Sequence, residues 1–216
     1  MSVIVVVVER ASACELLTHS HRETANALRA GGFFLDFSSP FSPRMNLQSD
    51  DFELFGLARR FAQERSAIDA RWKELQREAH PDKFAAQGAA AQRVAMQWSV
   101  RINEAYQRLK DPMRRAAYLC ELHGAPIRAE DNTAMPAAFL MQQIEWREAL
   151  EDARADSELD ALDDEVAQAR RAALAQCEQL IDQQQDYAGA ARQVRALMFI
   201  ARFADDIERR REQLGQ

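Results

Sequence analysis

The sequence predicts an all-α protein built from two helical modules. It has 7 glycines and 6 prolines in 216 residues, which leaves few turns. Alanine, leucine, glutamine, glutamate and arginine are abundant, and runs of β-branched residues are almost absent after residue 10, as expected of long helices. The net charge of −6 is unevenly shared. Residues 46–124 carry 13 basic and 11 acidic side chains and residues 125–216 carry 11 and 19, which indicates two modules with different partners.

Residues 1–44 differ in pattern from the rest of the chain. They contain the β-prone run V3-I-V-V-V-V8, which is short for a signal peptide and has no basic residue before it. Their four acidic residues argue against a mitochondrial presequence. We expect that translation starts at Met45 and that residues 1–44 are a misassigned extension. A disordered or strand-forming arm is the alternative.

The first module is expected to span residues 45–124. Asp51 is a good N-cap for a short helix, and Gly56 is placed to end that helix. A second helix is predicted from about residue 63 to 79, because apolar side chains recur there at helical spacing. Its stripe consists of Ile68, Trp72, Leu75 and Ala79.

A third helix, from about residue 91 to 110, repeats this spacing. Its stripe consists of Val94, Trp98, Ile102, Ala105 and Leu109. A loop that contains Gly88 joins the two helices, so they should form an antiparallel hairpin. Asp111 and Pro112 then provide a cap and a first helical position for a fourth helix, which should stop at Gly124.

The second module is expected at residues 136–216. It follows a linker, residues 125–135, that is rich in turn formers and has no periodicity. Three helices with short connections are typical of an antiparallel bundle. We expect them at about 136–152, 157–185 and 188–214.

The second helix breaks at E78-A-H-P-D-K-F84, because a residue that precedes proline disfavours the helical conformation. In an enzyme, His80 and Asp82 could act as a base and its orienting partner. The sequence, however, fixes no serine or cysteine nucleophile nearby and has no glycine-rich phosphate loop. We therefore expect no catalytic residue and no enzymatic activity in this chain. A helix stop with a solvated histidine is the simplest alternative for an isolated tripeptide.

The tripeptide is accompanied by other characteristic segments. The basic helix before it, R101-I-N-E-A-Y-Q-R-L-K-D111 after it and R114-R-A-A-Y118 beyond resemble the J-domain of DnaJ-type co-chaperones in order and spacing. The resemblance implies that the tripeptide contacts a DnaK-class chaperone and stimulates its ATPase, while the basic residues steer the encounter. The implied chaperone-binding residues are His80, Pro81, Asp82, Lys83, Arg71, Lys73 and Arg77. For the four basic residues, a merely solvated helix face is the alternative.

The remaining residues are similar to one branch of these co-chaperones. The chain has no Gly/Phe-rich region and no CxxCxGxG zinc module. Instead, D51-F-E-L-F-G-L57, H80-P-D-K-F84 and A138-F-L-M-Q-Q-I-E-W-R-E-A-L150 resemble the HscB family of iron–sulfur cluster assembly. The resemblance implies a co-chaperone that binds the scaffold protein IscU through its C-terminal bundle. It further implies that the co-chaperone delivers the scaffold to the DnaK-class chaperone HscA and activates the ATPase of HscA.

The helix that starts at Pro136 has two distinct faces. The face that can fill the bundle core consists of Phe139, Gln143, Trp146 and Leu150. The neighbouring face runs from apolar residues into carboxylates, as an exposed partner site does. By the resemblance, the scaffold-binding residues are Leu140, Met141, Ile144, Glu145, Glu148 and Asp152, with Phe199 from the last helix. Ile144 and Phe199 could instead be core residues, and Asp152 stands where the family usually has a longer glutamate.

No metal or other cofactor is expected. The three cysteines are dispersed and the four histidines form no HxxxH or HExxH pair. Dispersed thiols suit a reducing compartment, so we expect a cytoplasmic protein. No apolar stretch approaches the ~20 residues that span a bilayer, and the acidic second module argues against nucleic acid. We therefore expect no membrane and no nucleic-acid partner. We also expect the chain to be a monomer.

The residues leave two other functions open. The chain could be a J-domain co-chaperone of a general DnaK with unfolded clients, in which case Leu140, Met141 and Ile144 should be buried. It could also be a non-catalytic helical assembly protein whose tripeptide is only a helix stop. In that case His80→Gln would change nothing functional.

Overall fold

The computed structural model describes residues 48–128, 135 and 137–215, and every regular element in these ranges is helical. The all-α prediction is confirmed. The elements in chain order are α1 (Asp51–Phe55), α2 (Arg65–Glu78), η1 (Pro81–Gln87), α3 (Ala89–Lys110), α4 (Pro112–Leu122), α5 (Ala137–Asp152), α6 (Asp156–Glu178), η2 (Gln179–Gln183) and α7 (Tyr187–Leu214). The proposed extension, residues 1–44, and most of the proposed linker, 125–135, lie outside the described residues.

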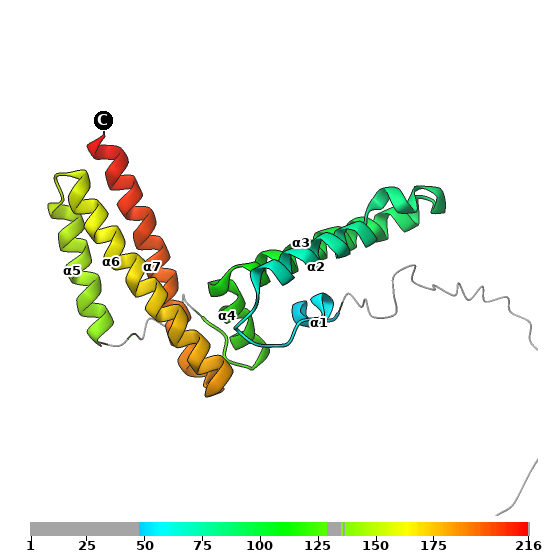
Figure 1. The fold of residues 1–216 in the computed structure, drawn as a ribbon, viewed down its shortest axis with the longest axis horizontal. Coiled ribbons are helices and arrows are strands. Elements are labelled where there is room, and N and C mark those ends of the chain that lie inside the picture. Colours follow the sequence, from blue (N-terminus) through cyan, green and yellow to red (C-terminus); the bar gives the residue numbers. More distant parts are fainter. Residues whose placement is uncertain (1–47, 129–134, 136, 216) are drawn as a thin grey trace, which may run out of the picture. The chain divides into compact units, whose positions relative to one another are not determined.

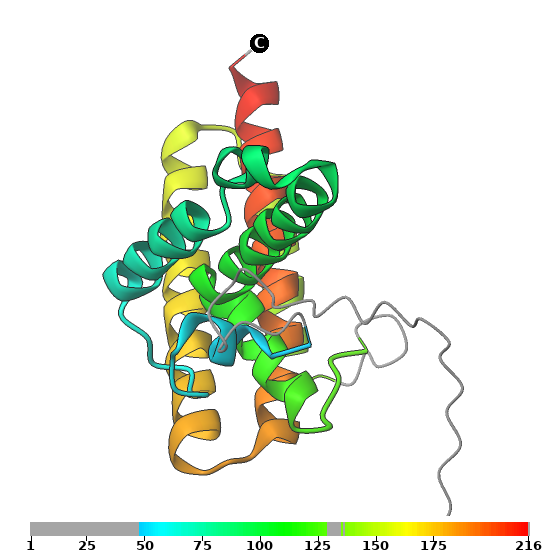
Figure 2. The ribbon, with the colours of Figure 1, turned by 90° about the vertical axis from the view of Figure 1, so that its right-hand side faces the viewer.

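The helices α2 and α3 form the hairpin that the apolar stripes predict, and they lie side by side in Figures 1 and 2. The buried residues of the two stripes are Ile68, Leu75, Ala79, Trp98, Ile102, Ala105 and Leu109. Trp72 and Val94 are only half-buried. The Trp72 ring stacks on Tyr106 at 4.8 Å, and its indole N–H donates to the side chain of Asn103 at 2.9 Å. An indole at the edge of the core keeps its polar group paired in this way.

The start of α1 differs from the prediction. Its N-cap is Asp50, whose Oδ1 accepts a hydrogen bond of 2.9 Å from a backbone N–H of the first turn. The expected cap, Asp51, is instead fully buried and pairs with Arg101 and Arg108 of α3. Two adjacent aspartates fit the same capping pattern, and only the packing of α1 on α3 distinguishes them. Gly56 ends the helix as predicted, with a φ of 65°.

The connection between α2 and α3, expected to be a loop, consists mostly of the 3₁₀ helix η1. His80 is extended and Pro81 takes the first helical position, where its missing N–H breaks no helical hydrogen bond. Gly88, with a φ of 93°, ends η1 and leads into α3. Because η1 packs against α3, the break in the hairpin is an ordered part of the fold.

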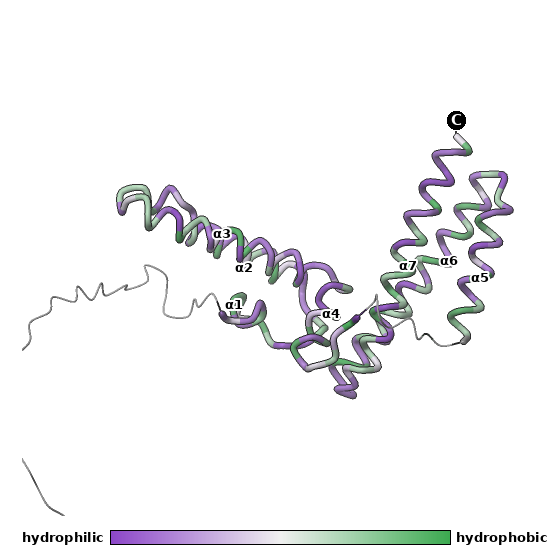
Figure 3. Tube along the Cα trace, turned by 180° about the vertical axis from the view of Figure 1, so that it is seen from behind, coloured by the Kyte–Doolittle hydropathy of each residue, from purple (hydrophilic) through white to green (hydrophobic). Residues whose placement is uncertain are grey.

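The helices α5, α6 and α7 form the predicted three-helix bundle (Figure 1). Its buried side chains include Trp146, Leu159, Leu162, Val166, Val194, Leu197, Ile200, Phe203 and Ile207. The π-helical turn η2 ends α6, and Asp186 caps α7 by accepting from the backbone N–H of Gly189 at 2.8 Å. Figure 3 shows that the N-terminal half of α5 is hydrophobic and its C-terminal half hydrophilic.

The helix α4 packs against α7, and the described ranges belong to one compact unit. The Arg195 guanidinium of α7 donates to the backbone carbonyl of Ile127 at 3.0 Å. The ring of His123, at the end of α4, stacks on Tyr187 with centroids 3.8 Å apart. The helices before and after the proposed linker are therefore also joined by direct contacts between α4, Ile127 and α7.

Candidate functional site

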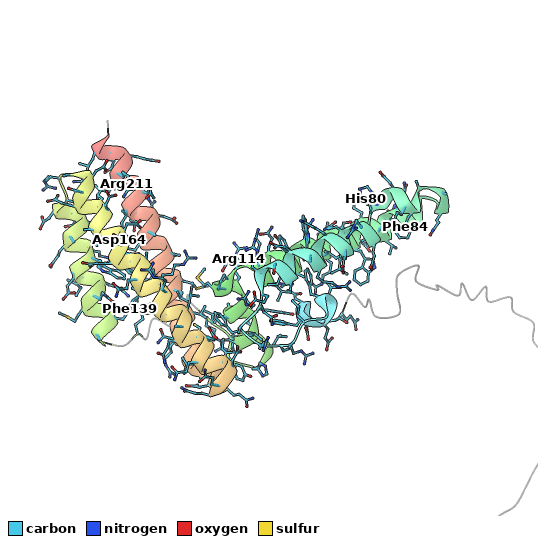
Figure 4. The ribbon with its side chains drawn as sticks, viewed as in Figure 1. His80, Phe84, Arg114, Phe139, Asp164 and Arg211 are labelled. Carbon is cyan, nitrogen blue, oxygen red and sulfur yellow. The ribbon has the colours of Figure 1, made fainter. Side chains whose placement is uncertain are left out.

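The His-Pro-Asp tripeptide lies at the outer end of the α2–α3 hairpin, where Figure 4 labels His80. The side chains of His80 and Asp82 are 58% and 90% exposed. The Nδ1 atom of His80 accepts a hydrogen bond of 3.3 Å from the backbone N–H of Asp82, so the imidazole caps η1. The backbone carbonyl of His80 accepts from the N–H of Lys83 at 3.0 Å. The backbone is thus held in a defined turn while the two polar side chains face solvent.

Two buried residues hold the tripeptide from either side. Ala79, directly before it, has no exposed surface, and Phe84, two residues after it, is buried in the core. An exposed segment whose backbone is anchored at both ends loses little conformational entropy when a partner binds, which suits recognition.

The basic residues expected to steer a partner lie on α2 and η1. Arg71 forms an ion pair with Glu74 one turn later, with Nη1 and Oε2 3.1 Å apart. The Arg77 Nε donates to the backbone carbonyl of Lys73 at 3.2 Å. Lys73, Arg77 and Lys83 are exposed. The structure therefore leaves these cations at the surface of α2 and η1, and the charge of Arg71 is partly neutralised by Glu74.

A second exposed surface lies on α5. Leu140, Met141 and Ile144 are 44%, 58% and 50% exposed, whereas Trp146 of the same helix is buried. The carboxylates that continue this face, Glu145, Glu148 and Asp152, are exposed as well. Ile144 is therefore not a core residue. Three neighbouring exposed apolar side chains on one helix are typical of an interaction site.

Phe199 of α7 is half-buried and lies against α5. Its ring meets Phe139 edge to face at 5.8 Å and stacks on Phe203 at 6.2 Å. The guanidinium of Arg147 lies 5.7 Å from its ring centroid. Phe199 thus packs partly in the core and lies at the edge of the α5 surface, and its contact with a scaffold stays a prediction.

Sequence reasoning missed exposed apolar residues on α7 and on α3. Met198, next to Phe199, is 38% exposed, and its position on the same helix could have indicated it. Met96 and Val100 of α3 are 61% and 53% exposed and line an open groove with Arg93 and Glu104. Their i, i+4 spacing on the face away from the predicted stripe was the available signal.

The described cysteines have no reactive character. Cys120 and Cys177 are buried free thiols. Burial raises the pKa of Cys120 to about 11 and that of Cys177 to about 12. A thiol is a nucleophile or metal ligand only as the thiolate, so both act as apolar packing groups at neutral pH.

Among the residues that the structure describes, no group of histidine, cysteine, aspartate or glutamate side chains is placed to hold a metal ion. None of the described helices is long and apolar enough to cross a membrane.

A helical hairpin that presents His-Pro-Asp at its break, followed by a three-helix bundle, defines a J-domain co-chaperone. Comparison with known proteins narrows this class. Residues 135–208 match the family model described as the HSCB C-terminal oligomerisation domain. The chain is 50% identical over 173 residues to the co-chaperone protein HscB homolog of Burkholderia thailandensis. The aligned residues are 79% of this chain and 98% of the relative. The chain is also 50% identical over 159 residues to the homolog of Bordetella avium, which covers 73% and 95%. The chain therefore belongs to the HscB co-chaperone family.

Solved structures agree with this assignment. The chaperone HscB from Vibrio cholerae superimposes with a TM-score of 0.66 at 38% identity, covering 77% of this chain and 99% of the other. The crystal structure of human co-chaperone protein HscB has a TM-score of 0.72 at 23% identity, covering 77% and 84%. The human protein shares the fold with this chain.

Proposed function

We propose that this chain is a co-chaperone of iron–sulfur cluster biogenesis that binds the scaffold IscU, brings it to the chaperone HscA and stimulates the ATPase of HscA. The observation that carries the proposal is the pair of exposed surfaces, one at the tip of the α2–α3 hairpin and one on α5. In this proposal residues 45–124 are the J-domain, 125–135 the linker and 136–216 the scaffold-binding bundle.

The hairpin tip is the proposed chaperone-binding surface. An exposed cationic helix favours encounter with an acidic docking surface, and a rigid turn then fixes the register of the complex. The residues proposed to make this contact are His80, Pro81, Asp82, Lys83, Arg71, Lys73 and Arg77. The chain itself makes and breaks no covalent bond, because the hydrolysis takes place in the partner chaperone.

The surface on α5 is the proposed scaffold-binding surface. Exposed apolar residues supply contact area, and the flanking carboxylates add specificity for a partner with basic residues at the rim. The residues proposed for it are Leu140, Met141, Ile144, Glu145, Glu148, Asp152 and Phe199. A general DnaK co-chaperone should have buried Leu140, Met141 and Ile144, so their exposure favours the scaffold over unfolded clients.

The steady-state ATPase of purified HscA tests the proposal, with this chain present and with IscU added or omitted. We expect stimulation that rises further with IscU, and His80→Gln is the matched control that should abolish it. Stimulation without any effect of IscU would leave the bundle without the proposed partner. No stimulation at all would reduce the break at His80 to a helix stop.

We also propose that the chain works in the cytoplasm, as a monomer, and without a cofactor of its own. The description of the matching family model as an oligomerisation domain makes the monomer a point to test. Sedimentation equilibrium of the chain alone and with IscU separates self-association from assembly with a partner.

A further inference from the structure

The backbone carbonyl at the end of α2 pairs with a hydroxyl group on α3. The last carbonyl groups of a helix lack intrahelical donors, and a following proline has no N–H to offer. The backbone carbonyl of Ala79, directly before His80 and Pro81, accepts a hydrogen bond of 3.2 Å from the Oγ atom of Ser99. Ser99 therefore pairs with the carbonyl that borders the tripeptide.

Further hydrogen bonds join the same two helices, with the donors on α2 and the acceptors on α3. The Gln76 side chain on α2 donates from Nε2 to the backbone carbonyl of Ser99 at 3.3 Å and to Oδ1 of Asn103 at 2.8 Å. The Trp72 indole donates to that same Oδ1 at 2.9 Å. Donors from α2 thus hold α3 at Ser99 and Asn103, and the hydroxyl of Ser99 holds the end of α2.

The tripeptide depends on this arrangement because its own side chains are mostly exposed. The orientation of His80 and Asp82 toward a partner follows from the backbone that carries them. On the C-terminal side that backbone is anchored by buried Phe84, and on the N-terminal side by the carbonyl of Ala79. Loss of the Ser99 contact would leave a half-buried carbonyl unpaired and the N-terminal anchor weaker.

We propose that Ser99 is a positioning residue for the chaperone response, because it fixes the exit of the chain from α2 and so the orientation of His80, Pro81 and Asp82. This role rests on the proposed function, in which the tripeptide triggers ATP hydrolysis by HscA. Ser99 acts through the tripeptide backbone and is itself half-buried between the helices.

Three variants of the full chain test the role. Ser99→Ala removes the hydroxyl while placing a better helix former in α3, so a defect cannot come from loss of helix propensity. Ser99→Thr keeps the hydroxyl and should restore the wild-type behaviour. Ser66→Ala removes an exposed hydroxyl from α2 of the same hairpin and serves as the matched control.

Two measurements are needed on each variant. Amide hydrogen exchange reports the tripeptide backbone without any partner, through the N–H of Ala79, which donates to Leu75, and that of Lys83, which donates to His80. A titration of HscA ATPase with the variant separates maximal stimulation from the concentration that gives half of it. For Ser99→Ala we expect exchange at both amides about fivefold faster and maximal stimulation about fivefold lower, the size of one lost hydrogen bond. The half-maximal concentration should change little, because the basic face of α2 is intact.

The outcomes are distinct. Restoration by Ser99→Thr, with Ser66→Ala like wild type and IscU binding unchanged in all three, supports the role. If Ser99→Ala stimulates HscA fully while His80→Gln does not stimulate it, the role of Ser99 is overturned and the proposed function stands, whether or not amide exchange is faster. Failure of Ser99→Thr to restore either readout also overturns it. A wild-type chain that never stimulates HscA overturns the proposed function and this role with it, and amide exchange then still reports whether Ser99 holds the turn.

Discussion

The carboxylate of Asp182 in η2 accepts a hydrogen bond of 2.6 Å from the backbone N–H of Phe61, 121 positions earlier in the chain. Its second oxygen accepts from the N–H of Ala62 at 2.9 Å. The segment between α1 and α2, which has no regular structure of its own, is thereby fixed to the end of α6. The Phe61 ring is buried and lies 5.2 Å from the Arg115 guanidinium of α4, so polar and apolar contacts meet at this point.

Removal of this carboxylate should lower the stability of the whole chain. Asp182→Ala leaves two backbone N–H groups without their charged acceptor, and we expect the free energy of unfolding to fall by about 2 kcal/mol. Urea denaturation followed by circular dichroism measures the change. Asp164, labelled in Figure 4, is an exposed residue of the preceding helix α6, and Asp164→Ala should alter the free energy of unfolding by less than about 0.5 kcal/mol. Equal effects of the two substitutions would contradict an anchoring role for Asp182.

Loss of the buried carboxylate of Asp51 should lower the free energy of unfolding more than loss of Asp182. Its Oδ2 lies 2.6 Å from Nε of Arg108 and its Oδ1 lies 2.6 Å from Nη1 of Arg101. Asp51→Ala leaves the Arg101 and Arg108 guanidinium groups without their shared anion, and because Arg108 is 41% exposed to solvent the cost should be about 3 kcal/mol, the lower end for a buried pair. Differential scanning calorimetry checks this value. Glu53→Ala, whose side chain is exposed on the same helix, is the control and should cost less than about 1 kcal/mol.

The two buried thiols should resist alkylation. With Cys14 replaced by alanine, the remaining thiols are Cys120 and Cys177. A pKa of about 11 for Cys120, against an ordinary value of 9.0, leaves about 100-fold less thiolate at pH 8. We therefore expect iodoacetamide to label the folded chain at least about 100-fold more slowly than the chain in urea. Rapid labelling without denaturant would place these thiols at an accessible surface.

The same thiols should make the protein less stable in alkali. Below pH 9 they are protonated in the folded and the unfolded chain alike. Above pH 9 the unfolded chain releases their protons, whereas the folded chain keeps them until about 11 for Cys120 and about 12 for Cys177. The unfolded state then binds fewer protons, so the free energy of unfolding falls as pH rises. Cys177→Ser should reduce the steepness of this fall in urea titrations between pH 9 and 11, and an unchanged slope would argue against the thiols as its source.

Met141 should matter for binding and not for folding. Its side chain is largely exposed, so Met141→Ser should change the free energy of unfolding by less than about 0.5 kcal/mol. If α5 binds the scaffold as proposed, the same substitution should weaken the affinity for IscU by at least about tenfold in isothermal titration calorimetry. Met96→Ser removes an equally exposed methionine from α3 and should leave that affinity unchanged. Similar losses from both variants would indicate non-specific apolar binding.

Much of the fold follows from local pattern. The stripes on α2 and α3 and the cap and proline at the start of α4 predict those elements within a few residues, because periodicity and capping act between near neighbours in the chain. The exposure of Leu140, Met141 and Ile144 agrees with the two-face pattern of α5. Phe199 was ambiguous, because a single aromatic at a bundle edge fits the core and the surface equally well.

The sequence by itself determined that this chain is helical, where most of its helices begin and end, and that His80, Pro81 and Asp82 interrupt a basic helix. These properties depend on backbone preferences and on spacings of a few residues. Only the tertiary structure decided which of Asp50 and Asp51 is the cap, that Asp182 holds Phe61, and that Ser99 pairs with the carbonyl beside the tripeptide. The contacts of Ser99 with Ala79 and of Asp182 with Phe61 join residues 20 and 121 positions apart in the chain. The cap falls on Asp50 because Asp51 is paired with α3. The free energy of such contacts depends on burial, which no local pattern encodes.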